Sequence, residues 1–416
     1  MSANSADQLA ARSAIAHSAS RASHVPPGLI RDIDLRGYEA QDPYERLAAL
    51  RSEGRVFFNL TYGPMSEEAG IWVLTRAEDI RTALQQPEIF SSQNTVGFSR
   101  MIGETWSLIP LELDPPTHSQ FRAILNGIFS PNRMKVMEDG IRARAASLID
   151  RIVGDGGCEF VETFGRPFPV SIFMQLMGLP EEHTDQFNAW EYGLLHSQDP
   201  AQQVMAARAI VDYLRALIAK RKVEPADDLT TFCVNARIEE RPVTDDEIMG
   251  MCFLLFIAGL DTVAASLSLH FRHLAMNPAD QARLRADPSL IPNAVEELLR
   301  RYAIVTSTRL LTRDVEFAGV SMKAGDRVLF STILANLDPD EFERPMAVDL
   351  DRSPNRHVSF LYGAHRCIGS HLARRELVIS MEEWLKRVPP FRIGRGREAP
   401  VAPGGLLSVH ALPLEW

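Results

Sequence analysis

The most informative stretch of this sequence is Phe360-Leu-Tyr-Gly363-Ala-His365-Arg-Cys367-Ile-Gly369. It places one cysteine in a glycine-flanked loop directly before the helical pattern of residues 370–384. A thiolate there is stabilised by the positive end of the helix dipole and by backbone N–H groups that lack helical partners. The two glycines permit a tight turn and the close approach of a large flat ligand. A buried free cysteine before a helix is the plain alternative, but it leaves the rest of the pattern unexplained.

Composition sets outer limits on the class of protein. The chain has 416 residues, 45% of them hydrophobic, and shows no linker-like stretch in its middle. The formal net charge of -10 argues against nucleic acid as a partner. The cysteines form no Cys-x-x-Cys pair, which disfavours a zinc or iron–sulfur site and fits a reducing cytoplasm. They are Cys158, Cys233, Cys252 and Cys367.

The N-terminus and the hydropathy pattern give no sign of a membrane protein. No run of 18 consecutive apolar residues is present, so no membrane span is expected. Residues 1–24 lack the apolar centre of a secretory signal and are rich in Ala, Ser and Arg. A mitochondrial presequence has this composition too, but we favour a mobile arm. Residues 25–416 are then expected to form a single cytoplasmic domain.

The periodicity predicts a mainly helical protein with a small β region. Residues 70–75 have the pattern of a strand, and residues 77–280 are mainly helical. Two further strands are expected at 309–317 and 326–332. Ala-Gly turns at 318–319 and 324–325 separate them. Residues 338–366 form a long irregular stretch that leads to the cysteine loop, and loops of this length inside a compact domain usually serve a function.

Three groups of polar residues stand out within the helical part. Glu297 and Arg300 are three residues apart, so they share one face of a helix expected over 293–302. Asp261 and Thr262 lie inside the apolar helix expected over 248–274, where buried polar groups must be satisfied or must mark a distortion. His118 and Arg122 are four residues apart on another helix and form a basic surface suited to carboxylates.

The cysteine stretch resembles the haem-binding signature of cytochromes P450, Phe-x-x-Gly-x-His-x-Cys-x-Gly. The resemblance implies that the chain binds haem b, with Cys367 as the axial ligand of the iron. It implies the triangular, mainly α fold of that family. The other cofactor-binding residues that it implies are Phe360, Gly363, Gly369, Ala258 and Gly259 around the haem, and His118, Arg122, Arg309 and His365 at its propionates.

The same resemblance gives roles to the polar helical residues. Thr262 would hydrogen-bond dioxygen, and Asp261 would connect it to bulk protons through water. Glu297 and Arg300 would form a buried structural ion pair that is joined by a second arginine. Arg344 and Arg352 are both candidates for that arginine, and the spacing of the loop favours Arg352.

Residues 25–416 also resemble, more closely, the bacterial camphor 5-monooxygenase group. The stretches that carry this are Leu113–Pro116, Gln120–Ala123, Gly178–Glu182, Gly259–Val263, Glu296–Arg301, His371–Glu376 and Ala411–Leu414. The resemblance implies a monomer that receives electrons from NADH through a ferredoxin reductase and a [2Fe–2S] ferredoxin. The ferredoxin would dock near Arg122.

The sequence departs from the camphor group at substrate and proton-delivery positions. Trp106 stands where a tyrosine binds the camphor ketone, and an indole N–H still donates to one carbonyl or ether oxygen. Gly97 replaces a phenylalanine, while Leu254, Ile257, Val305 and Leu406 keep the pocket apolar. Asn188 and His196 replace the lysine and arginine that hold the acid of the camphor enzyme, so Asp261 is expected to have other partners. The sequence does not show whether a cation binds near Glu104.

The sequence therefore predicts a haem-thiolate monooxygenase that hydroxylates an unactivated C–H bond of a small terpenoid. The sequence does not choose among camphor, cineole, norisoprenoids such as ionones, and other small terpenoids. A peroxide-driven peroxygenase is disfavoured, because it has no need of the pair Asp261 and Thr262. A haem-based sensor is disfavoured by the apparent substrate cavity and by the lack of an output domain.

Overall fold

The structure is a computed structural model that describes residues 22–35, 37, 42–61, 70–197 and 199–416. The helices are α2 (Pro43–Ala49), α3 (Ala77–Leu84), α4 (Phe98–Met101), α5 (Thr117–Asn126), α6 (Pro131–Asp150), α7 (Pro167–Met177), α8 (Thr184–Leu195), α9 (Pro200–Val223), α10 (Leu229–Val234), α11 (Asp245–Leu260), α12 (Thr262–Met276), α13 (Pro278–Ala286), α14 (Ile291–Arg301), α15 (Thr332–Asn336) and α16 (Ser370–Arg387). The strands are β1 (Ile30–Arg31), β2 (Val56–Asn59), β3 (Ile71–Leu74), β4 (Phe90–Ser91), β5 (Gly157–Glu159), β6 (Arg237–Ile238), β7 (Arg241–Pro242), β8 (Thr306–Leu311), β9 (Val315–Phe317), β10 (Val320–Met322), β11 (Arg327–Ser331), β12 (Arg392–Ile393) and β13 (Pro413–Glu415).

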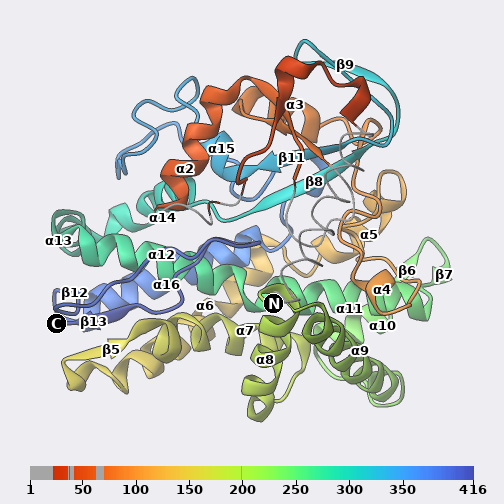
Figure 1. Ribbon diagram of the computed structural model, residues 1–416. Helices are drawn as coiled ribbons and strands as arrows, with labels where there is room; N and C mark the ends of the chain where they lie inside the picture. Colours follow the sequence, from red (N-terminus) through yellow and green to blue (C-terminus); the bar gives the residue numbers. More distant parts are fainter. Residues whose placement is uncertain (1–21, 36, 38–41, 62–69, 198) are drawn as a thin grey trace, which may run out of the picture.

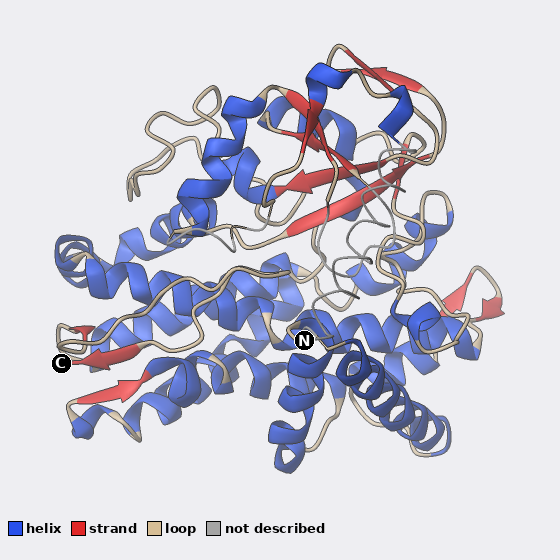
Figure 2. Cartoon of the chain, in the orientation of Figure 1, coloured by secondary structure: helices blue, strands red, loops and turns tan. Residues whose placement is uncertain are grey.

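The largest sheet has the strand order β1-β2-β3-β11-β8-β4 and gathers at one side of the molecule, whereas helices make up most of the rest (Figures 1 and 2). Its centre joins distant parts of the chain, because β11 pairs in parallel with β3 and antiparallel with β8. Val328 is opposite both Trp72 and Arg309. This register places Arg309 on a strand anchored in the core.

The helix expected over 248–274 is broken at Asp261, which separates α11 from α12. α11 begins with a capping box, in which Thr244 accepts from the N–H of Glu247 and the Glu247 side chain accepts from the N–H of Thr244. At the break, the Thr262 hydroxyl donates to the carbonyl of Ala258 at 3.1 Å. A hydroxyl bonded to the carbonyl four residues back bends helices, and this explains why the apolar pattern is not one continuous helix.

One segment of the described chain, Asp245–Met276, is long and apolar enough to cross a membrane by length and composition. Two thirds of its apolar window is buried inside the protein (67%). A core helix passes the same test, and Figure 1 shows α11 and α12 crossing the helical part among other helices.

α16 follows the cysteine loop and packs along α6. Trp384, near its C-terminal end, is fully buried against the rings of Phe160, Phe164 and Phe271. Aromatic rings in such edge-on contacts bury large apolar areas with defined geometry. The helix that begins beside Cys367 is therefore anchored in the core at its far end.

Two further segments differ from the sequence-based expectation. The strand expected over 309–317 is two strands, β8 and β9, because residues 312–314 leave the ladder. The expected mobile arm falls mostly outside the described residues, but its last three, Ala22–His24, form a short 3₁₀-helix. Ala22 is buried, and the His24 Nε2 atom lies 2.9 Å from the Asp326 carboxylate. These three residues therefore belong to the packed domain.

Candidate functional site

The loop before α16 has the tight backbone that its glycines suggest. Gly363 adopts φ = 70°, and a Cβ atom there would lie 2.3 Å from the Leu84 carbonyl oxygen. Leu361 also has a positive φ of 57°, where a side chain is disfavoured by about 1 kcal/mol. The backbone N–H of Cys367 donates to the Phe360 carbonyl at 2.8 Å. The loop thus holds Cys367 at the start of α16.

Burial, one backbone N–H and nearby arginines set the pKa of the Cys367 thiol. The surrounding protein raises the pKa of Cys367 by desolvation, while the N–H of Gly369 and the charge of Arg122 act in the opposite direction. Cys367 is nevertheless accessible to solvent. Arg374 covers the ring of Phe360, with its guanidinium 4.4 Å from the ring centroid. A metal at the sulfur would supply the missing stabilisation of the thiolate.

Four basic side chains meet next to this loop. The rings of His118 on α5 and His365 lie 4.2 Å apart. Burial and the charge of Arg309, followed by those of His118 and Arg122, lower the pKa of His365 to about 3. Burial lowers the pKa of Arg309 to about 10. Burial and the charges of the arginines therefore disfavour further positive charge at this place, and a bound anion would relieve that effect.

The hydrogen-bond pattern of the cluster also points to an anion. Both ring nitrogens of His118 and the Nη2 atom of Arg309 are buried without a hydrogen-bond partner in the described part of the chain. The acid that acts on Arg309 is Asp114, whose carboxylate already accepts from Ser91 and from the N–H of Ser92. Ser92 also binds the ring of His365 at 3.1 Å. A pair of propionates fits the free donors of this cluster.

One stripe of the central helix is more accessible than its neighbours. Leu254 and Thr262 are half-buried and Ala258 is exposed, whereas most residues of α11 are buried. Residues four apart share one face of a helix, so these three form a continuous row. The row would face the haem and the substrate. Gly259 lies off this row. A Cβ atom on Gly259 would lie 2.3 Å from the ring of Phe173, so the ring packs directly against this glycine.

Trp106 lies in a loop that is docked onto α11. Its ring is 4.8 Å from that of Phe253, and the indole is only 3% exposed. The loop approaches so closely that a Cβ atom on Gly250 would lie 2.1 Å from the Ser107 carbonyl oxygen. The indole Nε1 atom has no hydrogen-bond partner among the described residues. Gly250 therefore positions Trp106, although a glycine in a helical pattern gives no sign of that role.

The remaining expected pocket residues divide into two groups. Val305 and Leu406 are neighbours through an isolated β-bridge, and Ile257 is buried on α11. Gly97 instead adopts φ = 83°, and a Cβ atom there would meet the Arg100 side chain at 2.6 Å. The left-handed backbone conformation alone accounts for the glycine without a substrate, so its expected role in the pocket stays a prediction.

Asp261 has a histidine partner. The His196 Nε2 atom, at the end of α8, lies 2.8 Å from the Asp261 carboxylate and 3.8 Å from that of Glu191. Burial alone would lower the pKa of His196, but the hydrogen bond and the charge of Asp261 outweigh it and raise the pKa. Asn188, also on α8, forms no hydrogen bond with Asp261 in the described part of the chain. Glu191 carries no sequence signal, because a single glutamate in a helix pattern resembles a surface residue.

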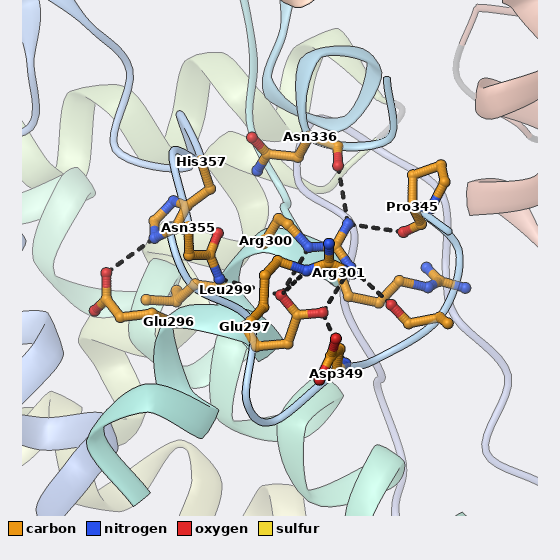
Figure 3. A network of polar contacts seen from close by, with 12 residues as sticks. Glu296, Glu297, Leu299, Arg300, Arg301, Asn336, Pro345, Asp349, Asn355 and His357 are labelled. Atoms are coloured by element: carbon orange, nitrogen blue, oxygen red, sulfur yellow. Dashed lines mark hydrogen bonds and ion pairs between the residues drawn. The ribbon is translucent and has the colours of Figure 1, made fainter. Parts of the chain in front are cut away.

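Glu297 and Arg300 form the centre of a buried network (Figure 3). Arg352 donates to Glu297 at 3.0 Å, whereas Arg344 is exposed and lies 3.8 Å from Asp349. The guanidinium of Arg300 binds Glu297 at two points and uses its remaining donors on backbone carbonyls. These belong to Asn336, Pro345 and Ala347. The network fixes the irregular stretch that leads to Cys367, as the expected structural role requires.

Comparison with known proteins places these features in one family. A family model described as cytochrome P450 matches residues 194–388. Probable cytochrome P450 127A1 of Sinorhizobium fredii is 41% identical over 403 residues, which cover 94% of this chain and 96% of the relative. Steroid C26-monooxygenase of Mycobacterium tuberculosis is 32% identical over 357 residues, which cover 83% of this chain and 88% of the relative.

Solved structures agree with the sequence relatives. The crystal structure of cytochrome P450 CYP101C1 superposes with a TM-score of 0.84 at 32% identity and covers 95% of this chain and 99% of its own. The crystal structure of CYP101J2 superposes with a TM-score of 0.81 at 32% identity. It covers 94% of this chain and 98% of its own. The chain therefore belongs to the cytochrome P450 monooxygenases, which bind haem b through a cysteine thiolate. Bound haem supplies the oxidising chemistry, and the thiolate donates electron density that favours O–O cleavage.

Proposed function

We propose that this protein hydroxylates an unactivated C–H bond of a small terpenoid that carries a carbonyl or ether oxygen. The observation that carries the proposal is the buried indole N–H of Trp106, which has no acceptor among the described residues. A desolvated donor is costly unless it is paired. Camphor, cineole and the ionones each offer one oxygen acceptor on an apolar skeleton.

The apolar residues expected to line the pocket support the same substrate class. Leu254 and Ile257 belong to α11, and Val305 and Leu406 come from neighbouring segments. A ligand held by one hydrogen bond and otherwise by apolar contacts is oriented by the bond and retained by its skeleton. In this arrangement the hydrogen bond from Trp106 orients the substrate. It thereby selects which carbon atoms of the skeleton point away from the indole.

Thr262 and Asp261 would move protons. The Thr262 hydroxyl is bonded to the carbonyl of Ala258, so its oxygen lone pairs stay available. Asp261 is one residue away and is hydrogen-bonded to His196, which holds its carboxylate in place. The carboxylate would pass protons to the hydroxyl through water, and no direct attack on substrate is required of either group.

We propose electron supply by a [2Fe–2S] ferredoxin that is reduced by an NADH-dependent reductase. Support comes from the likeness to the CYP101 structures and from the arginines near the thiol, Arg122 and Arg366, whose charges suit an acidic partner. Family membership alone does not set the substrate. Two relatives are named steroid C26-monooxygenase and mycinamicin IV hydroxylase/epoxidase, which points to very different substrates.

The test is an optical titration of the ferric protein with camphor, cineole and ionones. A ligand that displaces water from the iron shifts the Soret band from low to high spin. Each ligand is paired with a hydrocarbon of the same skeleton, such as bornane for camphor. We expect the oxygenated member of a pair to bind about tenfold more tightly. No shift with any member would contradict the small-terpenoid proposal, while a thiolate-type carbon monoxide spectrum would still verify the haem site.

A further inference from the structure

A polar cluster lies where α8 meets the break between α11 and α12. Glu191 belongs to α8, His196 ends that helix, and Asp261 occupies the break. Their ligand atoms all lie within 4.8 Å of one another. The cluster lines a cavity of about 220 Å³, which Arg166 and His410 also line. Side chains from separate elements thus converge on a space large enough for an ion and water.

Glu191 is the unusual member of the cluster. It is only 6% exposed, and its Oε1 atom has no hydrogen-bond partner among the described residues. Burial and the charge of Asp261 raise the pKa of Glu191 to about 8. A buried carboxyl group that faces a second carboxylate, and whose Oε1 atom accepts no hydrogen bond from the described residues, is in the electrostatic situation that a cation relieves.

We propose that Glu191, His196 and Asp261 bind a divalent transition-metal ion, with zinc as the best match. Zinc takes imidazole nitrogen and carboxylate oxygen at about 2.0–2.2 Å, so tetrahedral ligand atoms lie about 3.4 Å apart. The distances from the His196 Nε2 atom, 2.8 Å to Asp261 and 3.8 Å to Glu191, lie on either side of that separation. Water in the cavity would complete the coordination.

The chemistry of the donors selects among cations. An imidazole with two carboxylates suits zinc or a neighbouring transition metal, whereas calcium and magnesium prefer oxygen ligands alone. Arg166 opposes a cation, but its effect on Glu191 is smaller than those of Asp261 and His196. The ring of His410 is 6.3 Å from that of His196, too far to be a ligand without movement. A metal binds the state in which both carboxyl groups are ionised and His196 is neutral, and in that state the two carboxylates outweigh the single charge of Arg166.

Metal binding would have a consequence for catalysis that rests on the proposed role of Asp261. A coordinated carboxylate cannot pass protons to Thr262, so zinc is expected to lower the product formed per electron consumed. The metal would also cross-link α8 to the central helix. Binding itself does not depend on that role, and the two are measured separately.

The test is equilibrium dialysis of the haem-loaded, chelator-treated full chain against zinc chloride. We expect the wild type to take up about one zinc ion with an affinity that falls about tenfold or more in Glu191→Gln and His196→Gln. His24→Gln is the matched control, because His24 and Asp326 form a His–Asp pair at 2.9 Å that belongs to no three-ligand cluster of the described chain. Its zinc affinity should equal that of the wild type.

The carbon monoxide spectrum and circular dichroism verify that each variant is folded. Absence of uptake by the wild type, or uptake unchanged in both Glu191→Gln and His196→Gln, would overturn the metal site. Zinc binding that depends on both residues supports the site whatever its effect on turnover. If such zinc leaves product per electron unchanged, the metal site stands and the proton-delivery role of Asp261 is contradicted.

Discussion

Arg300 and Glu297 face each other in a two-point ion pair, 2.8 Å at both contacts, with neither side chain exposed. The guanidinium of Arg300 spends its other three N–H donors on the backbone of the segment 336–347. A guanidinium has five donors, so every one is used. The pair therefore ties α14 to the irregular stretch that precedes Cys367, and this is a task that only arginine performs.

Replacement of Arg300 by lysine should destabilise the protein. Lysine has three donors and cannot bind a carboxylate in a two-point fork, so Glu297 would lose half of its ion pair in a buried place. We expect the free energy of unfolding to fall by about 3 kcal/mol, measured by urea denaturation of the haem-loaded protein. Arg344→Lys is the control, since that side chain is 69% exposed. Equal losses in both variants would refute the importance of the buried pair.

Removal of the indole N–H of Trp106 should weaken oxygenated ligands selectively. Trp106→Phe retains an aromatic ring against Phe253 and deletes the donor. We expect the dissociation constant of the bound terpenoid to rise about five- to tenfold, since a hydrogen bond contributes about 1 kcal/mol. The Soret titration measures this. The hydrocarbon of the same skeleton should bind both proteins alike, and a parallel loss of its affinity would show that packing alone is responsible.

Gly250 should tolerate no side chain. In Gly250→Ala the new methyl group would meet the Ser107 carbonyl oxygen at 2.1 Å, so the loop that carries Trp106 must move. Affinity for the oxygenated ligand is expected to fall about tenfold by the same titration. Gly140→Ala is the matched change, because Gly140 is an exposed helical glycine with open space around its Cβ position. It should bind ligand normally and gain up to about 1 kcal/mol of stability.

Thr262→Ala should separate electron consumption from product formation. The variant loses the hydroxyl proposed to pass protons, together with its bond to the carbonyl of Ala258. We expect NADH oxidation to continue while more peroxide and several-fold less product appear, as quantified by chromatography and a peroxide assay. Thr262→Ser retains the hydroxyl and should recover most of the coupling. Unchanged coupling in the alanine variant would remove Thr262 from proton delivery.

Acid should weaken the protein through Glu296. Burial alone would raise the pKa of Glu296, but hydrogen bonds from His357 and Arg374 outweigh it and lower the pKa to about 2. A carboxyl group with a depressed folded-state pKa stabilises the protein above its ordinary value near 4.5, and this contribution is lost as the pH falls toward 2. Glu296→Gln should therefore reduce the free energy of unfolding by about 2 kcal/mol at neutral pH and by progressively less below pH 4.5.

Urea denaturation at several pH values measures the difference between Glu296→Gln and the wild type. Glu343→Gln, an exposed carboxyl in the same irregular stretch, is the control and should change little at any pH. A difference for Glu296→Gln that is independent of pH would show that the carboxylate charge does not contribute.

The sequence predicts those parts of the site whose residue types are linked to chemistry at fixed spacing. Cys367 with its glycines, and Glu297 three residues before Arg300, are patterns of this kind, and α14 and α16 follow closely from them. The break at Asp261 is less predictable, because an apolar pattern is equally compatible with one helix or two. The break coincides with the bond from the Thr262 hydroxyl to the carbonyl of Ala258, a local side-chain geometry that the residue pattern permits but does not require.

Other residues leave no local trace in the sequence. Gly250 matters because of what lies against it, and the loop that does so is more than 100 positions away in the chain. Glu191 has the spacing of an ordinary helix residue, and only the folded chain brings it to Asp261. The sequence predicts the residues that define the family better than those that adapt this member of it.

The pairing of β3 with β11 sets an order of events during synthesis. Trp72 is made early, but its ladder partner Val328 leaves the ribosome more than 250 residues later. Until then β3 lacks its partner β11 on one side, and the loop that carries Cys367 has not yet been synthesised. The nascent chain must therefore keep an apolar strand from wrong partners through most of translation. Because Cys367 comes later still in the chain, haem is incorporated only after most of the protein has been synthesised.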